Sequence, residues 1–292
     1  MASHQALRIL VVMAHPHDFT HVSGTCGKHV DRGDHVTVVS ATGGQNIHNE
    51  PLERELRKPK ELQDAAVISE TDQQYVARKG HELDDVCEVF GIKDVRVLPF
   101  RDSHLEPSDQ LDQAIVDIIL DVRPHLLLTH APFSVPGRGR TSAGPDDHRV
   151  TGIAVERAVG LAGAPNRETR ARPHRIAKTL YTGIEWYHSD WDLIIDITDQ
   201  VTRRVRSEAM FKTQGHSAGF ALKRIQVGSG VAGWSGGFPY GEAFLYATRN
   251  LDDCLRVSDI EMNQAERPSM ERMAAVGTRV EDILEQERDR GG

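Results

Sequence analysis

Two short segments that contain histidine and aspartate, far apart in the chain, could together hold a metal ion. The first reads Ala-His-Pro-His-Asp and places His15 and Asp18 three positions apart. The second reads Pro-Asp-Asp-His and ends at His148. Two imidazoles and one carboxylate are a common catalytic zinc shell, in which water fills the remaining position. Such an ion lowers the pKa of its water to about 7 and polarises a carbonyl oxygen, which is the chemistry of a hydrolase.

An ordinary interpretation of the same residues has to be weighed against this one. The chain has 15 histidines, and a single histidine near the end of a strand is usually a surface residue or a satisfied core residue. A His-Pro-His-Asp turn can also be a simple loop. Each segment alone favours that interpretation. The metal hypothesis becomes the better one only because both segments follow predicted strands of one sheet.

Short apolar segments alternate with longer amphipathic segments through the first half of the chain. We expect strands at residues 7–13, 35–40, 95–100 and 125–129, and helices at residues 18–32, 69–90 and 111–122. This alternation predicts an α/β fold with a Rossmann-like, mostly parallel sheet flanked by helices. In such sheets the ligand site lies beyond the carboxyl ends of the strands. The segments after Met13, Ser40, Phe100 and Thr129 should therefore meet in one crevice.

The second half of the chain is less regular. We expect a loop at 133–145, a helix at 150–161, strands at 179–187 and 193–197, a helix at 201–213 and a late strand at 244–248. The glycine-rich residues 228–241 should be flexible or tightly turned, and 261–290 a charged helical tail that is solvated or contacts another subunit. Residues 1–292 are expected to form one domain, with the main sheet in 1–200 and C-terminal helices and a cap region in 201–292.

Composition indicates a globular protein without nucleic-acid or membrane partners. The chain is 39% hydrophobic and 27% charged, which are ordinary values. Its net charge of −8 argues against binding to nucleic acid. Neither a secretory signal nor a membrane-spanning segment is expected. Cys26, Cys87 and Cys254 are predicted to be reduced thiols of a cytoplasmic protein, with Cys26 a packing residue more readily than a ligand.

Both histidine segments resemble motifs of the PIG-L/LmbE-like de-N-acetylases. Residues 14–18, followed by Gly24 and Cys26, resemble the family's Ala-His-Pro-Asp-Asp signature. Residues 145–148, followed by Gly152, resemble its second motif, His-Pro-Asp-His. Weaker similarities extend over most of residues 7–250. The resemblance implies that His15, Asp18 and His148 bind Zn²⁺, or another divalent transition metal. It also implies hydrolytic deacetylation of an amino-sugar-like or related small molecule.

The sequence departs from the family pattern at two catalytic positions. His17 stands where the family has an aspartate as general base, and Pro145 where it has a histidine credited with acid catalysis or oxyanion stabilisation. An imidazole has an ordinary pKa near 6.5, so His17 could take a proton from water and return it to the leaving amine. We favour this catalytic role. His17 could instead be an additional metal ligand or a substrate contact.

Asp147 is the second candidate catalytic residue. A carboxylate beside a ligand histidine often orients an imidazole, and His17 is a plausible partner for it here. Alternatively, Asp146 or Asp147 could cap the helix that follows. On the substrate side, Arg78 and Lys79 are expected near the rim of the crevice, where these basic residues could bind hydroxyl or anionic groups. Asp102, at the end of a predicted strand, is a further candidate for contact with substrate.

The leading prediction is a zinc-dependent amidohydrolase that acts on a small molecule through a metal-bound water and assembles as a homo-oligomer. Because of His17 and Pro145, two alternatives stay open. One is metal-assisted chemistry other than deacetylation, and the other is a metal-retaining binding protein without catalysis. A dinucleotide-binding domain is less favoured, since no Gly-x-Gly-x-x-Gly follows the first strand.

Overall fold

A seven-stranded sheet forms the centre of the molecule in this computed structural model. The structure describes all residues except 1–4, 47–48, 104, 134–145, 183–190 and 291–292. The strands lie in the order β3-β2-β1-β4-β5-β7-β6. They are β1 (Arg8–Met13), β2 (His35–Thr42), β3 (Asp94–Phe100), β4 (Leu126–His130), β5 (Lys178–Thr182), β6 (Leu193–Asp196) and β7 (Gly241–Tyr246). The five strands from β3 to β5 pair in parallel, whereas β7 runs antiparallel to both of its neighbours. The predicted α/β fold with a mostly parallel sheet is therefore confirmed.

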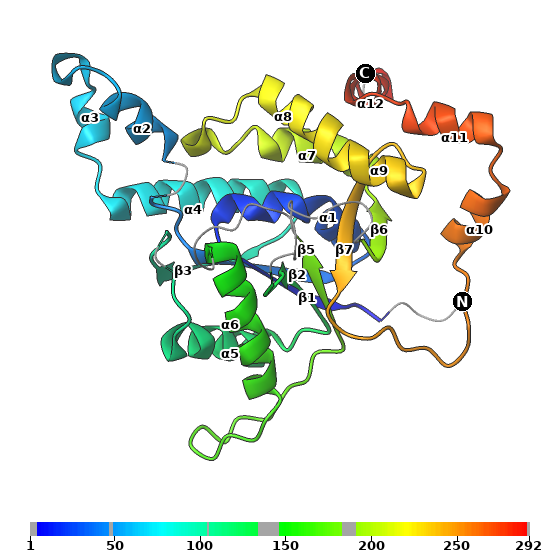
Figure 1. Ribbon diagram of the computed structural model, residues 1–292, viewed down its shortest axis with the longest axis horizontal. Coiled ribbons are helices and arrows are strands. Elements are labelled where there is room, and N and C mark those ends of the chain that lie inside the picture. Colours follow the sequence, from blue (N-terminus) through cyan, green and yellow to red (C-terminus); the bar gives the residue numbers. More distant parts are fainter. Residues whose placement is uncertain (1–4, 47–48, 104, 134–145, 183–190, 291–292) are drawn as a thin grey trace.

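The central strand β1 is buried on both faces, as its continuous apolar sequence predicts. Because successive side chains point to opposite faces, Ile9 and Val11 enter one hydrophobic core and Leu10 and Val12 the other. Figure 1 shows the corresponding helix layers on the two sides of the sheet. One layer contains α1 (Ser23–Asp31), α4 (Asp72–Val89) and α7 (Val201–Glu208), and the other contains α5 (Asp109–Val122) and α6 (Asp147–Ala162).

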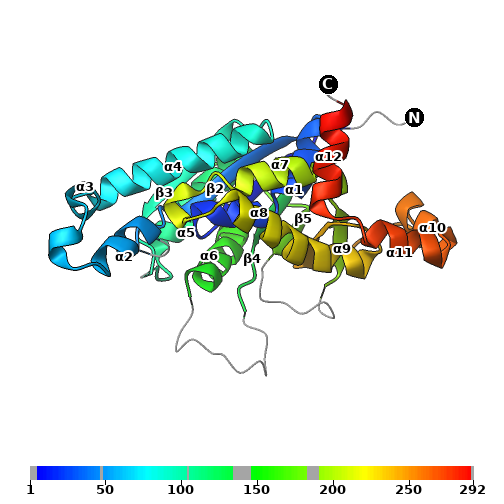
Figure 2. The same cartoon turned by 90° about the horizontal axis from the view of Figure 1, so that it is seen from above.

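The remaining helices lie around this core. They are α2 (Glu50–Leu56), α3 (Ala65–Ile68), α8 (Ala218–Arg224), α9 (Gly230–Gly236), α10 (Asp259–Glu266), α11 (Ser269–Val276) and α12 (Val280–Arg290). Short 3₁₀ helices are η1 (Pro16–His21), η2 (Lys60–Leu62), η4 (Thr198–Gln200) and η5 (Lys212–Gln214), and η6 (Ile225–Ser229) is a π-helix. In Figure 2, α8 and α9 follow one another from the middle of the view towards α11. None of the described helices combines the length and the apolar composition needed to span a bilayer.

The helix predicted at 18–32 is two helices. The 3₁₀ helix η1 occupies Pro16–His21, and α1 starts after Val22, whose ψ of 2° breaks the helical path. The proline at the first helical position favours the start of η1. The consequence is functional, because the tight turn of η1 keeps residues 15–18 at the end of β1.

The glycine-rich segment 228–241 was expected to be flexible or tightly turned, and this prediction was right for the turn at residues 237–240 but wrong for residues 228–236, which are helical. Residues 218–236 form one helical run made of α8, η6 and α9. A Cβ at Gly233 would lie 2.6 Å from the Pro239 oxygen and the Tyr240 nitrogen. Glycine is therefore used here because α9 packs directly on the backbone that leads into β7.

The C-terminal tail is also less solvated than its charge predicts. Val280, at the start of α12, is fully buried and packs with Ile197, Val201 and Tyr240 in a third hydrophobic cluster. The start of α12 is thus part of the body of the protein, whereas α10 and α11 have no buried residues.

Candidate metal centre

The first part of the site is built by η1 immediately after β1. His15 is the N-cap of η1 and has extended backbone angles, and Pro16 follows at the first helical position. The His15 backbone N–H donates to Asp18 Oδ2 over 2.8 Å. This capping arrangement fixes the Asp18 carboxylate relative to the His15 imidazole. A spacing of three residues therefore brings both side chains to one point.

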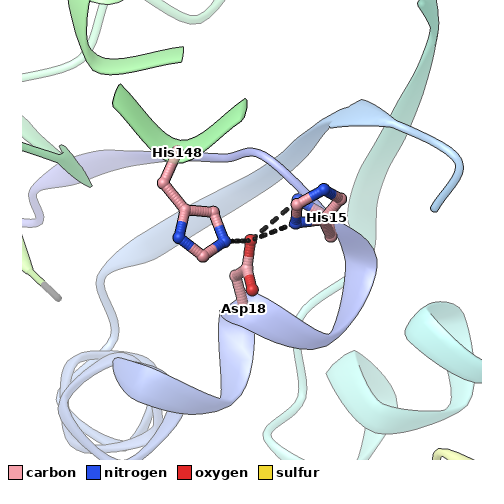
Figure 3. A group of neighbouring side chains, drawn as sticks. All are labelled: His15, Asp18 and His148. Atoms are coloured by element: carbon pink, nitrogen blue, oxygen red, sulfur yellow. Dashed lines mark hydrogen bonds and ion pairs between the residues drawn. The ribbon is translucent and has the colours of Figure 1, made fainter. Parts of the chain in front are cut away.

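His148, in the first turn of α6, completes the group. One ligand atom each from His15, Asp18 and His148 lies within 4.8 Å of the other two. Figure 3 shows the two imidazoles pointing at the same carboxylate oxygen from different elements of the fold. His15 Nδ1 lies 3.2 Å and His148 Nε2 3.4 Å from Asp18 Oδ2. The structure thus brings the three predicted metal ligands together, although their role stays a prediction.

The negative charge of Asp18 and the imidazoles around it shift one another's pKa values. Burial opposes ionisation of Asp18, but the surrounding histidines outweigh it and hold the pKa of this carboxyl well below its usual range. Burial also opposes protonation of His15, yet Asp18 and Asp147 raise the pKa of His15 to about 9. The pKa of His148 is likewise raised by Asp18 against the effect of burial. A buried anion surrounded by imidazoles suits a bound cation.

The two neighbouring aspartates at the start of α6 have different roles. Asp146 is the N-cap and accepts a hydrogen bond from the Arg149 backbone N–H over 2.9 Å. Asp147 Oδ2 instead lies 3.2 Å from His15 Nε2 and accepts from the Ser103 backbone N–H over 2.6 Å. The carboxylate therefore contacts the nitrogen of His15 that faces away from Asp18. The expected partner of Asp147 was His17, and the imidazole with which the structure pairs it is His15.

His17 lies on the other side of the Asp18 carboxylate. Its Nε2 is 3.2 Å from Asp18 Oδ1, whereas the ligand group gathers at Oδ2. Its ring is edge-on to Phe211 at 6.4 Å and stacks on the His15 ring at 5.9 Å. Burial lowers the pKa of His17 well below its usual range, so the neutral imidazole is favoured. The structure does not bring His17 into the group of three.

The strand ends do meet, as the parallel sheet predicted. At the last residue of β2, Thr42 Oγ1 donates to the Ala14 carbonyl over 2.8 Å. After β3, the buried carboxylate of Asp102 accepts from the Asn46 backbone N–H through both oxygens, at 2.9 and 3.0 Å. Asp102 thus fastens the segment after β2, a use that the sequence did not indicate. Its expected contact with substrate stays a prediction.

The neighbours Arg78 and Lys79 on α4 differ in burial. Lys79 is fully buried, and its ammonium group donates to the Gly44 carbonyl over 3.3 Å. Burial lowers the pKa of Lys79 to about 8, although the charges of Asp18 and Asp102 act in the opposite direction. Arg78 is partly exposed and makes two hydrogen bonds to Glu70, at 3.0 and 2.6 Å. Of the two, Lys79 is the one directed towards the site.

Sequence reasoning missed His130, the last residue of β4. This side chain is buried, and its Nε2 lies 3.3 Å from Asp18 Oδ2. The signal was present, because Thr129 was expected to be the last residue of a strand that points into the crevice. Pro145 and the end of the strand predicted at 179–187 lie outside the described residues. Cys26 belongs to the hydrophobic core, as expected.

Comparisons with known proteins identify the family to which this chain is related. The family model described as PIG-L, GlcNAc-PI de-N-acetylase, matches residues 10–159, slightly more than half of the chain. A 1D-myo-inositol 2-acetamido-2-deoxy-alpha-D-glucopyranoside deacetylase of Streptomyces griseus is 29% identical over 62% of this chain and 56% of its own length. A probable N-acetyl-alpha-D-glucosaminyl L-malate deacetylase of Bacillus cereus is 32% identical over 59% of this chain and 68% of its own.

The chain thus spans only about half the length of the Streptomyces relative. Among solved structures, the 4-carboxy-2-hydroxymuconate hydratase of Pseudomonas putida superposes with a TM-score of 0.67 at 17% identity, covering 86% of this chain and all of that one. At such low identity this likeness shows the fold alone. The match over residues 10–159 includes both histidine motifs and all three candidate ligands, and on this basis the chain belongs to the PIG-L family.

Proposed function

We propose that this chain is a metal-dependent deacetylase that hydrolyses the N-acetyl amide of an amino-sugar-containing small molecule. One observation carries the proposal: ligand atoms of His15, Asp18 and His148 lie within 4.8 Å of one another, although the residues are far apart in the sequence. The two deacetylase relatives support the reaction, because both names describe removal of an acetyl group from a glucosamine derivative.

The donor set fits a divalent transition metal. Two imidazole nitrogens and a carboxylate oxygen are ligands that zinc accepts, although iron and cobalt accept them too. The ligand His15 has its second nitrogen, Nε2, 3.2 Å from Asp147, and a carboxylate in this position fixes the orientation of a ligand imidazole. When bound, a divalent ion supplies a Lewis acid that polarises the acyl carbonyl and makes water nucleophilic near neutral pH. We propose zinc as that ion.

We assign the movement of protons to His17. Its Nε2 lies within 3.2 Å of Asp18 Oδ1, so it is adjacent to the ligand group without belonging to it. A neutral imidazole carries one donor and one acceptor nitrogen. Hydrogen bonding of one nitrogen to Asp18 would orient the ring, and the other nitrogen would act as the acceptor. His17 would take the proton of the attacking water and return it to the leaving amine. Because burial lowers the pKa of His17, this role requires that the negative charge developing on the substrate raise it again in the transition state.

We assign the binding of substrate polar groups to Lys79 and Asp102, with Arg78 farther out. Lys79 supports this role best, because its ammonium group is buried beside the acidic residues of the site. A buried ammonium or carboxylate can form charge-assisted hydrogen bonds to sugar hydroxyls. The proposal places the enzyme in the cytoplasm, in keeping with three free cysteines, of which two are buried.

Release of acetate from N-acetylglucosaminides linked to inositol and to malate tests the function. The protein should release acetate in proportion to its bound zinc, and no acetate should appear after chelation. Stoichiometric zinc without acetate release from any amide would contradict the deacetylase assignment. That result would favour a binding protein or another metal-assisted reaction.

Substitution of His17 tests the catalytic assignment. His17→Ala should keep its zinc and lose about 10²–10⁴-fold in kcat, the usual contribution of a general acid–base. His17→Asp, which restores the carboxylate of the family motif, should recover part of this loss. Full turnover in His17→Ala would show that His17 is not the base. Weaker zinc binding in His17→Ala would instead identify His17 as an additional ligand.

A further inference from the structure

Three imidazoles approach one carboxylate oxygen in this site, and the third belongs to none of the motifs. Besides His15 and His148, His130 lies with its Nε2 3.3 Å from Asp18 Oδ2. The His130 side chain is only 5% exposed. Among the described residues, this nitrogen makes no hydrogen bond of good geometry, and its contact with Asp18 is an ion-pair distance only. A buried nitrogen of this kind is normally satisfied, and Asp18 is the acceptor within reach.

We propose that His130 is a positioning residue for the metal site, which donates its Nε2–H to Asp18 and so fixes the direction of the ligand carboxylate. This inference rests on the proposed function, because it assumes that Asp18 binds the ion. It goes beyond that function by adding a residue that neither the motifs nor the group of three ligands contains.

The stacking of His130 on His148 distinguishes a positioning residue from a fourth ligand. Their ring centroids are 4.4 Å apart, and the ring planes are inclined by only 13°. An imidazole binds a metal through a lone pair that lies in the ring plane. The lone pairs of two stacked, nearly parallel rings cannot meet at one ion. If His148 binds the metal, His130 is therefore left to interact with Asp18.

The number of hydrogen-bond donors around Asp18 leads to the same assignment. Without an ion, Oδ2 is approached by imidazole nitrogens of His15, His130 and His148 and by the His15 backbone N–H. An imidazole nitrogen that coordinates a metal gives up its proton, so it can no longer donate. With His15 and His148 as ligands, His130 remains the one imidazole of these three that can donate to the carboxylate.

A close contact between the backbones of α6 and β4 supports the stacked rings of His130 and His148. Gly152 lies one helical turn after His148 on α6. A Cβ at this position would be 2.5 Å from the His130 carbonyl oxygen and 2.8 Å from the Ala131 carbonyl carbon. The helix therefore rests directly on the end of β4. This close approach fixes the separation of the two backbone segments that carry the His130 and His148 side chains.

Zinc affinity and the visible spectrum of the cobalt-substituted protein test the inference. His130→Leu should weaken zinc binding about 10–100-fold, the usual effect of removing a partner of a metal ligand. Its Co²⁺ spectrum should keep the band intensity of the wild type, because the number of ligands is unchanged. His130→Gln can present an amide N–H near the position of Nε2 and should restore most of the affinity. His125→Gln, immediately before the first residue of β4, is the matched control and should bind zinc as the wild type does.

Each contrary outcome identifies what is wrong. A changed Co²⁺ band intensity in His130→Leu would make His130 a ligand and overturn the positioning role. Unchanged zinc affinity in His130→Leu would also overturn the positioning role. So would a His130→Gln variant that fails to recover zinc affinity although it melts in chelator at the same temperature as the wild type. If the wild type itself binds neither Zn²⁺ nor Co²⁺, the proposed function fails and this inference fails with it.

Discussion

Charged groups gather at both ends of the parallel strands, here called the amino edge and the carboxyl edge of the sheet, and the two edges use them in different ways. At the amino edge, beside the first residues of β1, β2 and β3, a cavity of about 240 Å³ is lined by Arg8, His35, Asp94, Arg96 and Asp121 among others. Arg96 contacts both Asp94 and Asp121 at 2.8 Å. These side chains are about one third to two thirds exposed. Ion pairs in such positions contribute little energy.

At the carboxyl edge, the charges are buried and share one partner. Asp18 is fully buried and faces imidazoles, which can lose their protons. The cations at the amino edge are guanidinium groups, which stay protonated. In fixed ion pairs, the charges are already neutralised by each other, so they offer no binding site for a charged ligand. A buried carboxylate among groups that can become neutral is costly without a cation and favourable with one. Burial and the type of neighbouring base, and not the presence of a cavity, thus distinguish the candidate site from the opposite edge.

The largest expected effect comes from the carboxylate that the imidazoles share. Asp18→Asn should abolish stoichiometric zinc binding and reduce acetate release by about 10³-fold or more, because loss of the ion removes several kcal/mol of transition-state stabilisation. Asp94→Asn, at the amino edge, should change turnover by less than about twofold. Elemental analysis and an acetate assay on both variants measure this contrast. Comparable losses in the two variants would abolish the distinction between the edges.

A smaller effect is expected from the residue behind the ligand His15. Asp147→Asn should weaken zinc binding about 10–100-fold, since an amide orients the imidazole less strongly than a carboxylate. Asp146→Asn is the matched control, because asparagine is as good an N-cap as aspartate. Competition with a chromophoric chelator gives both affinities. Equal affinities in the two variants would remove Asp147 from the metal site.

The pH dependence of zinc binding tests the electrostatics of the buried group. The pKa of His15 is raised to about 9, so below pH 9 an incoming ion must displace its proton. The apparent zinc affinity should therefore rise about tenfold per pH unit for each displaced proton and level off above about pH 9. Calorimetry in buffers of different ionisation enthalpy counts the protons. An affinity that is constant between pH 7 and 9 would contradict the raised pKa.

The smallest effect concerns the two ends of α6. Gly152→Ala places a methyl group against the His130 carbonyl and should destabilise the protein by about 1–3 kcal/mol, as overpacking does. Gly160→Ala, where nothing lies within 4 Å of the new Cβ, should stabilise it by about 0.5–1 kcal/mol. Urea denaturation of both variants measures the difference. Equal shifts would mean that α6 does not press on β4.

The sequence predicted much of the architecture because the signals are local or periodic. One segment of the sequence predicts the apolar β1 and places His15 and Asp18 directly after it. Parallel pairing of the strands predicts that His148 lies at the same end of the sheet. His130 could have been found by the same rule. The contact of Asp147 with His15 could not, because it depends on how the start of α6 is oriented against the end of β1, and these two elements are far apart in the sequence. The close packing of Gly233 was also invisible, since glycine favours a turn when its neighbours in space are unknown.

The central claim is that His15, Asp18 and His148 hold one ion. An anomalous difference map at the zinc edge, from crystals grown with Zn²⁺, tests it most directly. We expect one dominant peak about 2.0–2.2 Å from His15 Nδ1, an Asp18 oxygen and His148 Nε2. A dominant peak instead at the exposed group of Asp252, Asp253 and Cys254, or no peak at stoichiometric zinc, would contradict the account.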